Sequence, residues 1–384
     1  MNWNPLKFLL LLLIKFLAFN RQAKLQDILR KEGVRIFIVA FVGIGDFFLM
    51  TSMIRHIKHK IRNSHITLLT DNERIAEYLI SQSFIIDEVV IFKINECSKS
   101  QFLKYCFSLR KRNIDIFIIP YINLNQNTLL IGLLSRARIL IGHGNGGTCR
   151  NIWSHILDTA IPLKEKTYEP YQYLTIAEYI TQSNSEDIRL VIEIPESIEN
   201  SISYKLSSMN INLSDSLLVQ FSASNGNFSW KNWPPSHFAR FLDTIIEKNK
   251  IEVVAVGSPG EKQMAQVIKK MMRHNFIDLT GKTTLQELIV CVKKAKMVLC
   301  LDSCIAHIAS AFGTPCITLF GPTDMWAYKG NFYAITNPVE CQPCVSFINR
   351  NPLAGNVNDC PNRKCLSGID VERVLEKFNK IWNH

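Results

Sequence analysis

Short apolar runs alternate with amphipathic stretches along almost the whole chain, and the same order repeats in each half. The first half has apolar runs at residues 34–42, 66–70, 85–92, 114–120 and 138–141, and the second half has them at 217–221, 251–256, 276–279, 298–301 and 316–320. Nearly continuous apolar runs of this length are typical of parallel strands that are covered on both faces. The pattern therefore predicts a strand of a buried sheet at each of these positions.

Between these runs, apolar residues recur at the spacing of amphipathic helices. The predicted helices follow the first strand to about residue 60 and then cover residues 72–82, 99–112, 124–135, 168–182, 196–210, 235–249, 260–274, 284–296, 305–312 and 370–382. Strands that alternate with helices predict an α/β protein with doubly wound parallel sheets. A polar break at 183–187 separates the halves, so we expect two Rossmann-like domains, residues 25–185 and 186–384, that face a central cleft.

Residues 1–24 stand apart from this alternation. Their apolar run at 8–14 is too short to span a bilayer, and Lys15 ends it. No small-residue cleavage site follows, although a signal peptide requires one. An apolar body with Trp3 near one end and basic residues on both sides favours a helix that lies on an anionic membrane surface. The alternative is an apolar helix that packs on the body of the protein.

The 384-residue chain carries a formal net charge of +11, spread along the sequence and not collected in one tail. Such an excess suits acidic partners, which include nucleic acid, an anionic membrane and a phosphorylated substrate. The sequence has no nucleic-acid-binding motif, so we expect no nucleic acid and favour the other two. Four of the eleven cysteines stand singly inside apolar runs, which is typical of reduced thiols in a reducing compartment, and they are Cys106, Cys291, Cys300 and Cys316.

The stretch 297–325 carries the strongest local pattern for a ligand site. Its first strand ends at Asp302 and Ser303, and its second strand ends at the polar turn 321–324. In parallel sheets, ligands bind outside the carboxyl ends of the strands. The short helix between the strands presents Ser303 and His307 on one face, and its N-terminus offers N–H groups to an anion. We therefore expect half of a phosphate-binding site here.

Asp46 follows the first predicted strand and lies at the start of a helix, just after Gly43 and Gly45. An aspartate at that position is often an N-cap that accepts backbone N–H groups. A carboxylate at the mouth of a cleft can also act as a general base. Both interpretations remain open on the sequence alone.

In the second half, Ser222, Ser224 and Lys231 follow the strand at 217–221. Hydroxyls and a lysine after a strand suit a diphosphate, although a surface loop with a solvated lysine has the same composition. Glu261 begins a helix, where it either complements the helix dipole or accepts hydrogen bonds from a ribose.

Four cysteines cluster near the C-terminus. Cys341 and Cys344 are two residues apart, and fifteen residues later come Cys360 and Cys365, which are four residues apart. This spacing is compatible with a structural zinc site, and the alternative is a compact loop with free thiols. The chain has no Asp-x-Asp motif of the kind that holds a divalent metal at a sugar diphosphate. We therefore expect no cofactor and no metal in the active site.

Several segments together resemble glycosyltransferase family 9, the ADP-heptose:lipopolysaccharide heptosyltransferases. GIGDFFLMTSMIRHIK resembles the family's N-terminal helix signature, SWKNWPPSHF resembles its Lys-x-Trp-Pro segment, and VGSPGEKQMA resembles its Gly-x-x-x-Glu turn. Residues 279–324 resemble the family's longest motif almost without gaps. The likeness runs from about residue 34 to the C-terminus and keeps the order of the motifs.

The resemblance implies a GT-B fold and an inverting, metal-independent transfer of heptose or a related sugar. The donor would be a nucleotide sugar, probably ADP-linked, bound by the C-terminal domain. The acceptor would be an anionic glycolipid of the lipopolysaccharide type, or another cell-surface glycan, bound by the N-terminal domain. The implied place of work is the cytoplasm, at the inner face of the bacterial inner membrane.

By motif position, the resemblance implies that Asp46 is the base that deprotonates the acceptor hydroxyl. Lys231 would hold the diphosphate, Glu261 would contact the ribose, and Thr283 would lie by the nucleobase. The full implied donor site is Ser222, Ser224, Lys231, Glu261, Thr283, Asp302, Ser303, Cys304, His307, Gly321, Pro322, Thr323 and Asp324.

The chain differs from the family at Cys304, where the family usually has glycine. A side chain there could crowd a backbone N–H that approaches phosphate. This difference motivates one alternative, a catalytically inactive protein on this fold that binds a sugar nucleotide or glycan. A separate alternative is a GT-B sugar-nucleotide epimerase.

Overall fold

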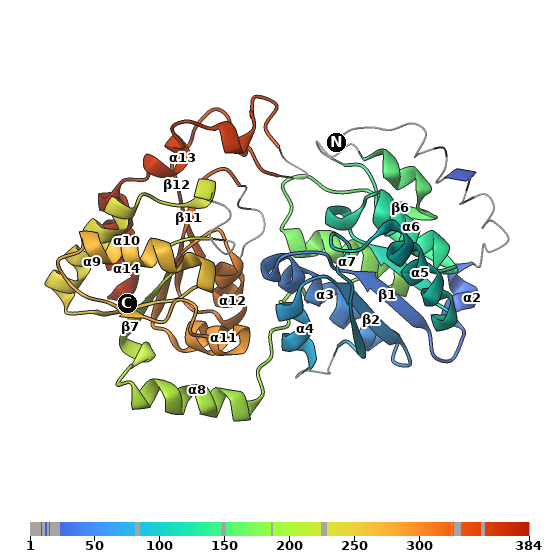
Figure 1. Cartoon of the computed structure of the whole chain (residues 1–384), viewed down its shortest axis with the longest axis horizontal. Helices are drawn as coiled ribbons and strands as arrows, with labels where there is room; N and C mark the ends of the chain where they lie inside the picture. Colours follow the sequence, from blue (N-terminus) through green and yellow to red (C-terminus); the bar gives the residue numbers. More distant parts are fainter. Residues whose placement is uncertain are drawn as a thin grey trace. The chain divides into compact units, whose positions relative to one another are not determined.

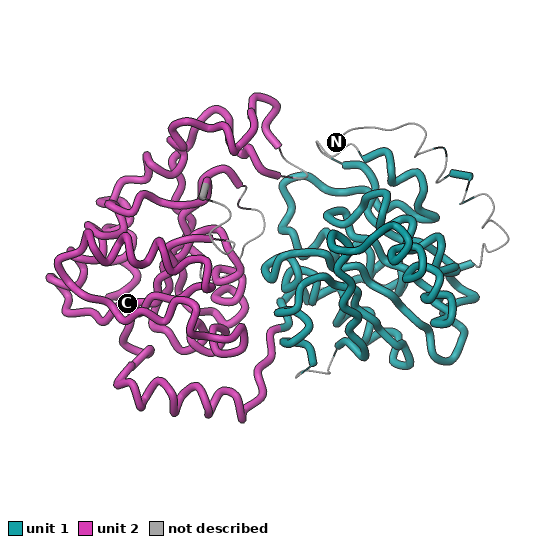
Figure 2. The backbone as a smooth tube through the Cα atoms, in the orientation of Figure 1, with its two compact units in different colours: residues 1–191 teal, residues 192–384 magenta. Residues whose placement is uncertain are grey.

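The computed structural model describes residues 9, 12, 13, 15, 24–80, 85–146, 151–185, 187–223, 229–323, 325, 332–346 and 350–383. The chain forms two compact units, residues 1–191 and 192–384, which are coloured separately in Figure 2. Each unit is an α/β domain whose sheet is flanked by helices (Figure 1). The predicted fold class, two doubly wound α/β domains, is confirmed.

Unit 1 contains, within its described residues, a sheet of six parallel strands in the order β3-β2-β1-β4-β5-β6. The strands are β1 (Arg35–Val39), β2 (His65–Thr70), β3 (Glu88–Ile91), β4 (Ile116–Ile119), β5 (Ile139–His143) and β6 (Thr159–Ile161). The helices are α2 (Leu25–Leu29), α3 (Ile44–Lys60), α4 (Glu73–Ile80), α5 (Lys99–Ser108), α6 (Gln126–Leu134) and α7 (Glu169–Thr181), with 3₁₀ turns η1 (Leu109–Arg112), η2 (Tyr121–Asn123) and η3 (Ile152–Ile156).

Unit 2 repeats this topology, because its described strands are ordered β12-β11-β10-β7-β8-β9 and are all parallel. The strands are β7 (Ser216–Val219), β8 (Glu252–Ala255), β9 (Ile277–Asp278), β10 (Met297–Leu301), β11 (Cys316–Phe320) and β12 (Phe332–Thr336). The helices are α8 (Glu196–Ser208), α9 (Pro235–Asn249), α10 (Lys262–Met271), α11 (Leu285–Lys294), α12 (Cys304–Phe312), α13 (Lys364–Ser367) and α14 (Val371–Trp382), with 3₁₀ turns η4 (Leu213–Asp215), η6 (Ser229–Lys231), η7 (Pro259–Glu261) and η8 (Val357–Asp359).

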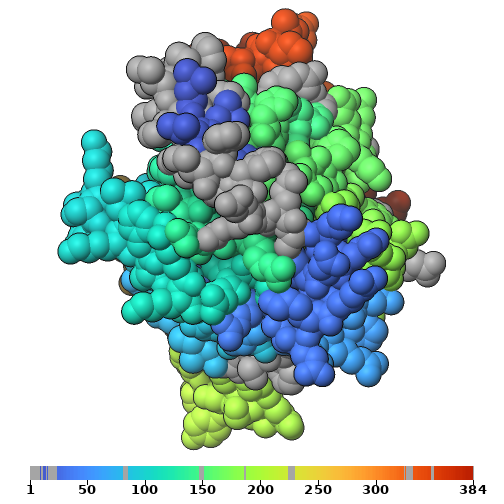
Figure 3. All heavy atoms as spheres, turned by 90° about the vertical axis from the view of Figure 1, so that its right-hand side faces the viewer, coloured from blue at the N-terminus to red at the C-terminus, as the bar shows by residue number. Residues whose placement is uncertain are grey.

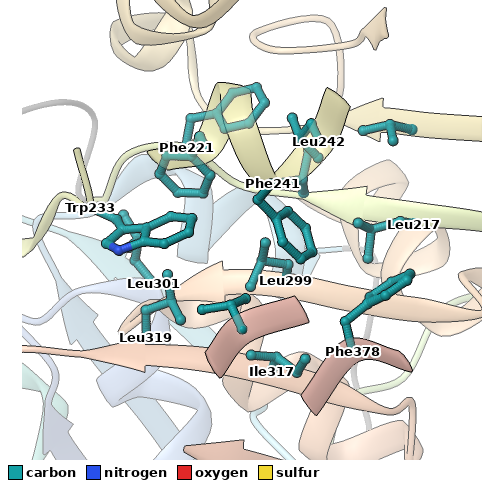
Figure 4. Close-up of a cluster of buried hydrophobic side chains, with 14 of the residues drawn as sticks. Leu217, Phe221, Trp233, Phe241, Leu242, Leu299, Leu301, Ile317, Leu319 and Phe378 are labelled. Atoms are coloured by element: carbon teal, nitrogen blue, oxygen red, sulfur yellow. The ribbon is translucent and has the colours of Figure 1, made fainter. Parts of the chain in front are cut away.

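The core of unit 2 explains why its strands are so apolar. Alternate residues of a strand point to the same face, and Leu299 and Leu301 of β10 therefore lie together with Ile317 and Leu319 of β11 (Figure 4). Phe241 of α9 covers this face. The ring of Phe378 of α14 packs edge-on against the ring of Phe241, with the two ring centroids 5.6 Å apart.

Each sheet reverses its strand order between two central neighbours, which are β1 and β4 in unit 1 and β7 and β10 in unit 2. Ligands of doubly wound sheets bind outside the carboxyl ends of the strands at this switch point. Asp46 follows β1 and Tyr121 follows β4, while Gln220 follows β7 and Asp302 follows β10. The fold thus sets polar side chains at both switch points.

Two strands of the sheets were not predicted from the sequence. In unit 1 the sheet continues beyond β5, the last strand predicted there, because β6 pairs with β5 as an edge strand. In unit 2, β12 extends the sheet beyond β11 in the same way. Both edge strands are only partly buried, with exposure along β6 and four partly exposed residues of five in β12. An edge strand needs no continuous apolar run, so the pattern that marks the central strands is missing.

Most of residues 1–24 lie outside the described residues, and the predicted membrane-surface helix falls mainly there. Among the described part, Lys15 donates a hydrogen bond to the carbonyl of Leu157 at 2.9 Å and lies 3.3 Å from the carboxylate of Asp158. In the part of the chain that the structure describes, no helix is both long enough and apolar enough to cross a membrane.

Candidate active site

A lysine–aspartate pair lies at the switch point of unit 2. Asp302 directly follows β10, and Lys231 ends the 3₁₀ turn η6. The Lys231 ammonium lies 2.6 Å from the Asp302 carboxylate and 3.3 Å from its carbonyl oxygen, and both side chains are only 15% exposed. Trp233 fixes the segment that carries the lysine, because its buried indole N–H donates to the carbonyl of Ile369 at 3.0 Å.

A chain of hydrogen bonds joins the start of α12 to the loop after β8. Ser303 is the N-cap of α12, and its hydroxyl accepts from the N–H of Ile305 at 3.3 Å. The same hydroxyl donates to the side-chain oxygen of Gln220 at 2.6 Å, and the Gln220 amide donates to the Glu261 carboxylate at 3.5 Å. The structure thus connects two predicted residues, Ser303 and Glu261, through Gln220, which the sequence analysis missed. Its signal was a polar residue that closes an apolar strand.

The buried Glu261 carboxylate is held in a tight turn. It accepts the N–H of Ser258 at 3.3 Å in a capping box. Gly257 has a φ of +156°, and a Cβ there would come within 2.1 Å of the Glu261 carboxylate. The N–H of Gly281 donates to the carbonyl of Gly257 at 2.7 Å, so the loop that carries Thr283 is tied to the loop that carries Glu261.

We expect Gly257→Ala to destabilise unit 2 and to weaken its hold on the Glu261 carboxylate. An alanine at positive φ costs about 1–2 kcal/mol, and displacing a buried carboxylate from its donors costs about 1–3 kcal/mol more. Gly313→Ala is the matched control, since Gly313 has a φ of +71° and open space around its Cβ position. Chemical denaturation should show the larger loss for Gly257→Ala. Equal losses would mean that the Glu261 contact contributes nothing.

His307 lies in the first turns of α12 and is 6% exposed. Burial lowers the pKa of His307 to about 4, while Asp302 acts to raise it and Lys231 to lower it. The imidazole is therefore neutral at pH 7, and it interacts electrostatically with both Lys231 and Asp302.

The stability of unit 2 should fall as the pH drops below the ordinary histidine value of about 6.5. Below that pH the histidine is protonated in the unfolded chain, whereas in the folded protein His307 stays neutral until about pH 4. Between pH 7.5 and 5 this linkage removes about 2 kcal/mol. Urea denaturation of His307→Gln should show a correspondingly flatter pH profile, and His274→Gln, on the surface of the same unit, should keep the wild-type slope. Parallel profiles for wild type and His307→Gln would contradict this role of burial.

The remaining predicted donor residues take the following places. Gly321, Pro322 and Thr323 follow β11, where the side-chain amide of Gln342 donates to the carbonyl of Gly321 and the N–H of Val345 donates to the carbonyl of Pro322 at 2.9 Å. Cys304 is the partly exposed first residue of α12, and Ser222 is buried after β7. The other two predicted positions, Ser224 and Asp324, lie outside the described residues.

The four C-terminal cysteines, Cys341, Cys344, Cys360 and Cys365, are all described, and their thiols are free. Within the described residues, no group of three or more His, Cys, Asp or Glu side chains is placed to hold a metal ion. The Cys344 thiol donates to the carbonyl of Cys341 at 3.2 Å.

At the switch point of unit 1, Asp46 lies in the first turn of α3, near a partly buried tyrosine–glutamate pair. The Tyr121 hydroxyl donates to the carboxylate of Glu169. Burial raises the pKa of Tyr121 well above its usual value, and the negative charges of Glu169 and Asp46 act in the same direction. Tyr121 is therefore a neutral donor, and it and Glu169 are polar neighbours of Asp46 that the sequence did not single out.

His143 at the end of β5 completes this polar group. Its Nδ1 accepts the N–H of Tyr121 at 3.2 Å, and its Nε2 donates to the carbonyl of Gln172 at 2.6 Å. Burial lowers the pKa of His143 to about 4, so the ring is neutral and fixed in one tautomer. The segment after β4 is thereby held rigidly beside Asp46.

Two six-stranded parallel sheets of this topology, each in its own unit, are the architecture of the GT-B fold. The sequence profile of glycosyltransferase family 9 (heptosyltransferase) matches residues 159–354, just over half of the chain. The chain therefore belongs to glycosyltransferase family 9, which confirms the resemblance inferred from its motifs.

Curated relatives match the chain over different lengths. Lipooligosaccharide heptosyltransferase 2 of Haemophilus influenzae is 32% identical over 98 residues, which cover 24% of this chain and 28% of that protein. The chain thus spans little more than a quarter of that relative in the matched region. Lipopolysaccharide heptosyltransferase 1 of Campylobacter coli is 21% identical over 360 residues, which cover 91% of this chain and 99% of that protein.

Solved structures share the fold over most of the chain. A family 9 glycosyltransferase of Veillonella parvula superposes with a TM-score of 0.73 at 21% identity and covers 91% of this chain and 97% of that one. An Escherichia coli heptosyltransferase solved with ADP has a TM-score of 0.62 at 15% identity and covers 90% of this chain and 99% of that one.

Proposed function

We propose that this chain is an inverting, metal-independent glycosyltransferase that moves heptose from ADP-heptose to a lipopolysaccharide-type acceptor. The observation that carries the proposal is the Lys231–Asp302 pair beside the N-terminus of α12 at the switch point of unit 2. Support for the donor comes from the E. coli heptosyltransferase of the same fold, solved with ADP and with ADP-2-deoxy-2-fluoro heptose.

Unit 2 supplies groups that suit a nucleoside diphosphate. The Lys231 ammonium and the positive end of the α12 dipole can both neutralise a diphosphate. The Asp302 carboxylate accepts a hydrogen bond from the Lys231 ammonium at 2.6 Å and so orients it. A lysine and a helix N-terminus can take the place of a divalent metal at the leaving group, which is why we propose a metal-independent reaction. Glu261 ends the neighbouring turn η7, and we propose it as an acceptor for ribose hydroxyls.

Unit 1 supplies the base. The Asp46 carboxylate takes the proton of an acceptor hydroxyl, and that oxygen attacks the anomeric carbon of the donor sugar. The bond from this carbon to the phosphate oxygen breaks, and ADP leaves with the electron pair. Attack from the side opposite the leaving group inverts the anomeric configuration. Lys231 stabilises the negative charge that develops on the departing diphosphate.

The acceptor class follows from the relatives and the charge. The proteins that match over most of their length are lipopolysaccharide heptosyltransferases. We propose an anionic glycolipid of the lipopolysaccharide type as the acceptor, and the net charge of +11 on this chain suits such a partner. We propose that the reaction takes place at the cytoplasmic face of a bacterial inner membrane.

A thermal-shift screen over ADP-, UDP-, GDP- and CMP-sugars tests the donor. ADP-heptose at about 100 times its Kd should stabilise the protein by about 2.7 kcal/mol. For a domain of this size that raises the Tm by roughly 5–10 °C. The other nucleotide classes should give no comparable shift. A strong shift with only a different nucleotide would reject ADP-heptose as the donor.

A further inference from the structure

The outer face of α5 in unit 1 leaves two large apolar side chains at the surface. Leu103 is 43% exposed and Phe107, one turn later, is 44% exposed. The inner face of the same helix packs on the core, where Cys106 is buried and Tyr105 stacks on Phe92 with ring centroids 3.8 Å apart. The helix is thus packed firmly on the domain, so the exposure of Leu103 and Phe107 is not caused by fraying of the helix.

The segment around this apolar pair, α5 and η1, carries only positive charges. Residues 99–112, KSQFLKYCFSLRKR, contain five lysines and arginines and no acidic residue. Arg112 is paired with Glu88. Within the described part of the chain the other four make no ion pair, and they are Lys99, Lys104, Arg110 and Lys111.

Arg110 connects the basic and apolar parts of this surface. Its guanidinium lies 4.5 Å from the centroid of the Phe107 ring, and its Nε donates to the carbonyl of Leu134 at 3.0 Å. Arg136 is exposed nearby, and its charge adds to burial in lowering the pKa of Arg110. Two guanidinium groups thus lie close together without an acidic counterpart, so an external anion would relieve their repulsion.

We propose that the α5 face, defined as Leu103, Phe107, Lys99, Lys104, Arg110, Lys111 and Arg136, docks on the surface of a bilayer that contains anionic lipid. An aromatic and an aliphatic side chain between cations suit the boundary of headgroups and acyl chains. Each lysine or arginine near an anionic surface adds attraction to phosphate groups. Figure 3 looks onto this side of unit 1, with the segment near residue 100 in cyan.

Charge decides between a bilayer and a second copy of the chain. An isologous contact would place the same patch of each subunit against the other. Five uncompensated cations would then face five more, and like charges repel. A lipid surface of opposite charge has no such cost. The proposal does not depend on which sugar the protein transfers.

Co-sedimentation of the full chain with vesicles of phosphatidylethanolamine and phosphatidylglycerol tests the docking. Leu103→Ser/Phe107→Ser should lower the partition coefficient about tenfold, and Lys104→Gln/Lys111→Gln should lower it by about tenfold or more. Binding should weaken with added salt and should be much lower on phosphatidylcholine vesicles.

The matched control is Val267→Ser/Met271→Ser on α10 of unit 2. These residues are also one turn apart, are 36% and 53% exposed, and lie among lysines. This pair should bind vesicles as the wild type does. Wild-type binding by the α5 variants would overturn the proposal. So would a dimer in solution that only the α5 variants lose, because the surface would then be a contact between copies of the chain. Unchanged circular dichroism keeps loss of binding distinct from unfolding.

Discussion

Replacement of Asp46 by asparagine should lower kcat for sugar transfer by about 10²- to 10⁴-fold, the usual contribution of a general base. The Kd for the donor should stay within about twofold of wild type, because the proposed donor groups belong to unit 2. Asparagine keeps the size of the side chain at the start of α3 but cannot take a proton. Steady-state transfer kinetics and calorimetric titration with ADP-heptose measure the two quantities separately.

Asp71 provides a matched control for this substitution. It follows β2 at the same edge of the sheet but away from the switch point, and burial raises the pKa of its carboxyl. Asp71→Asn should leave kcat close to that of wild type. If Asp46→Asn transferred sugar at the normal rate, or if Asp71→Asn lost the same activity, the assignment of the base would be wrong.

Replacement of Lys231 by methionine should lower kcat/KM for the donor by about 10²- to 10³-fold. The ammonium is the cation that we place on the diphosphate, and its loss removes both ground-state binding and stabilisation of the leaving group. The substitution also leaves the Asp302 carboxylate largely buried without its partner, so stability should fall by about 3–5 kcal/mol. Both effects are large enough to be measured on the same preparation.

The double variant Lys231→Met/Asp302→Asn separates these effects. Removing the charge of Asp302 as well should restore most of the stability while donor affinity stays low. Lys205→Met is the surface control, since its pair with Glu287 is exposed at 2.9 Å and such pairs contribute about 1 kcal/mol or less. Recovery of donor affinity in the double variant would show that Lys231 acts only on the fold.

The sequence was informative where physical constraints act on neighbouring residues. Central parallel strands must be apolar on both faces, so β7, β10 and β11 could be predicted from their runs alone, and helix periodicity located α9 and α12. The edge strands β6 and β12 were missed because half-exposed strands need no such run. The 3₁₀ turn η1 was merged with α5, since the two share one amphipathic pattern.

Candidate site residues were easier to find than the bonds between them. Asp302, Ser303 and Lys231 follow strand ends and could be selected on that basis, but the 2.6 Å pair between Lys231 and Asp302 joins residues 71 positions apart. Gln220 escaped notice because its signal, a single polar residue at the end of an apolar strand, does not show which side chains it bonds. Tyr121 and Glu169 escaped because their partnership depends on how α7 packs beside β4 and β5, which no sequence spacing specifies.

The measurement that tests the central claim most directly is mass spectrometry of a transfer reaction in the presence of a metal chelator. It combines the purified chain, ADP-heptose and a lipopolysaccharide acceptor that lacks its heptoses. We predict that the acceptor gains the mass of one heptose with release of ADP, and that Asp46→Asn gives no such product on the same time scale. An acceptor that stays unchanged with ADP-heptose but gains a sugar from another nucleotide donor, or that reacts equally well with Asp46→Asn, would contradict the account.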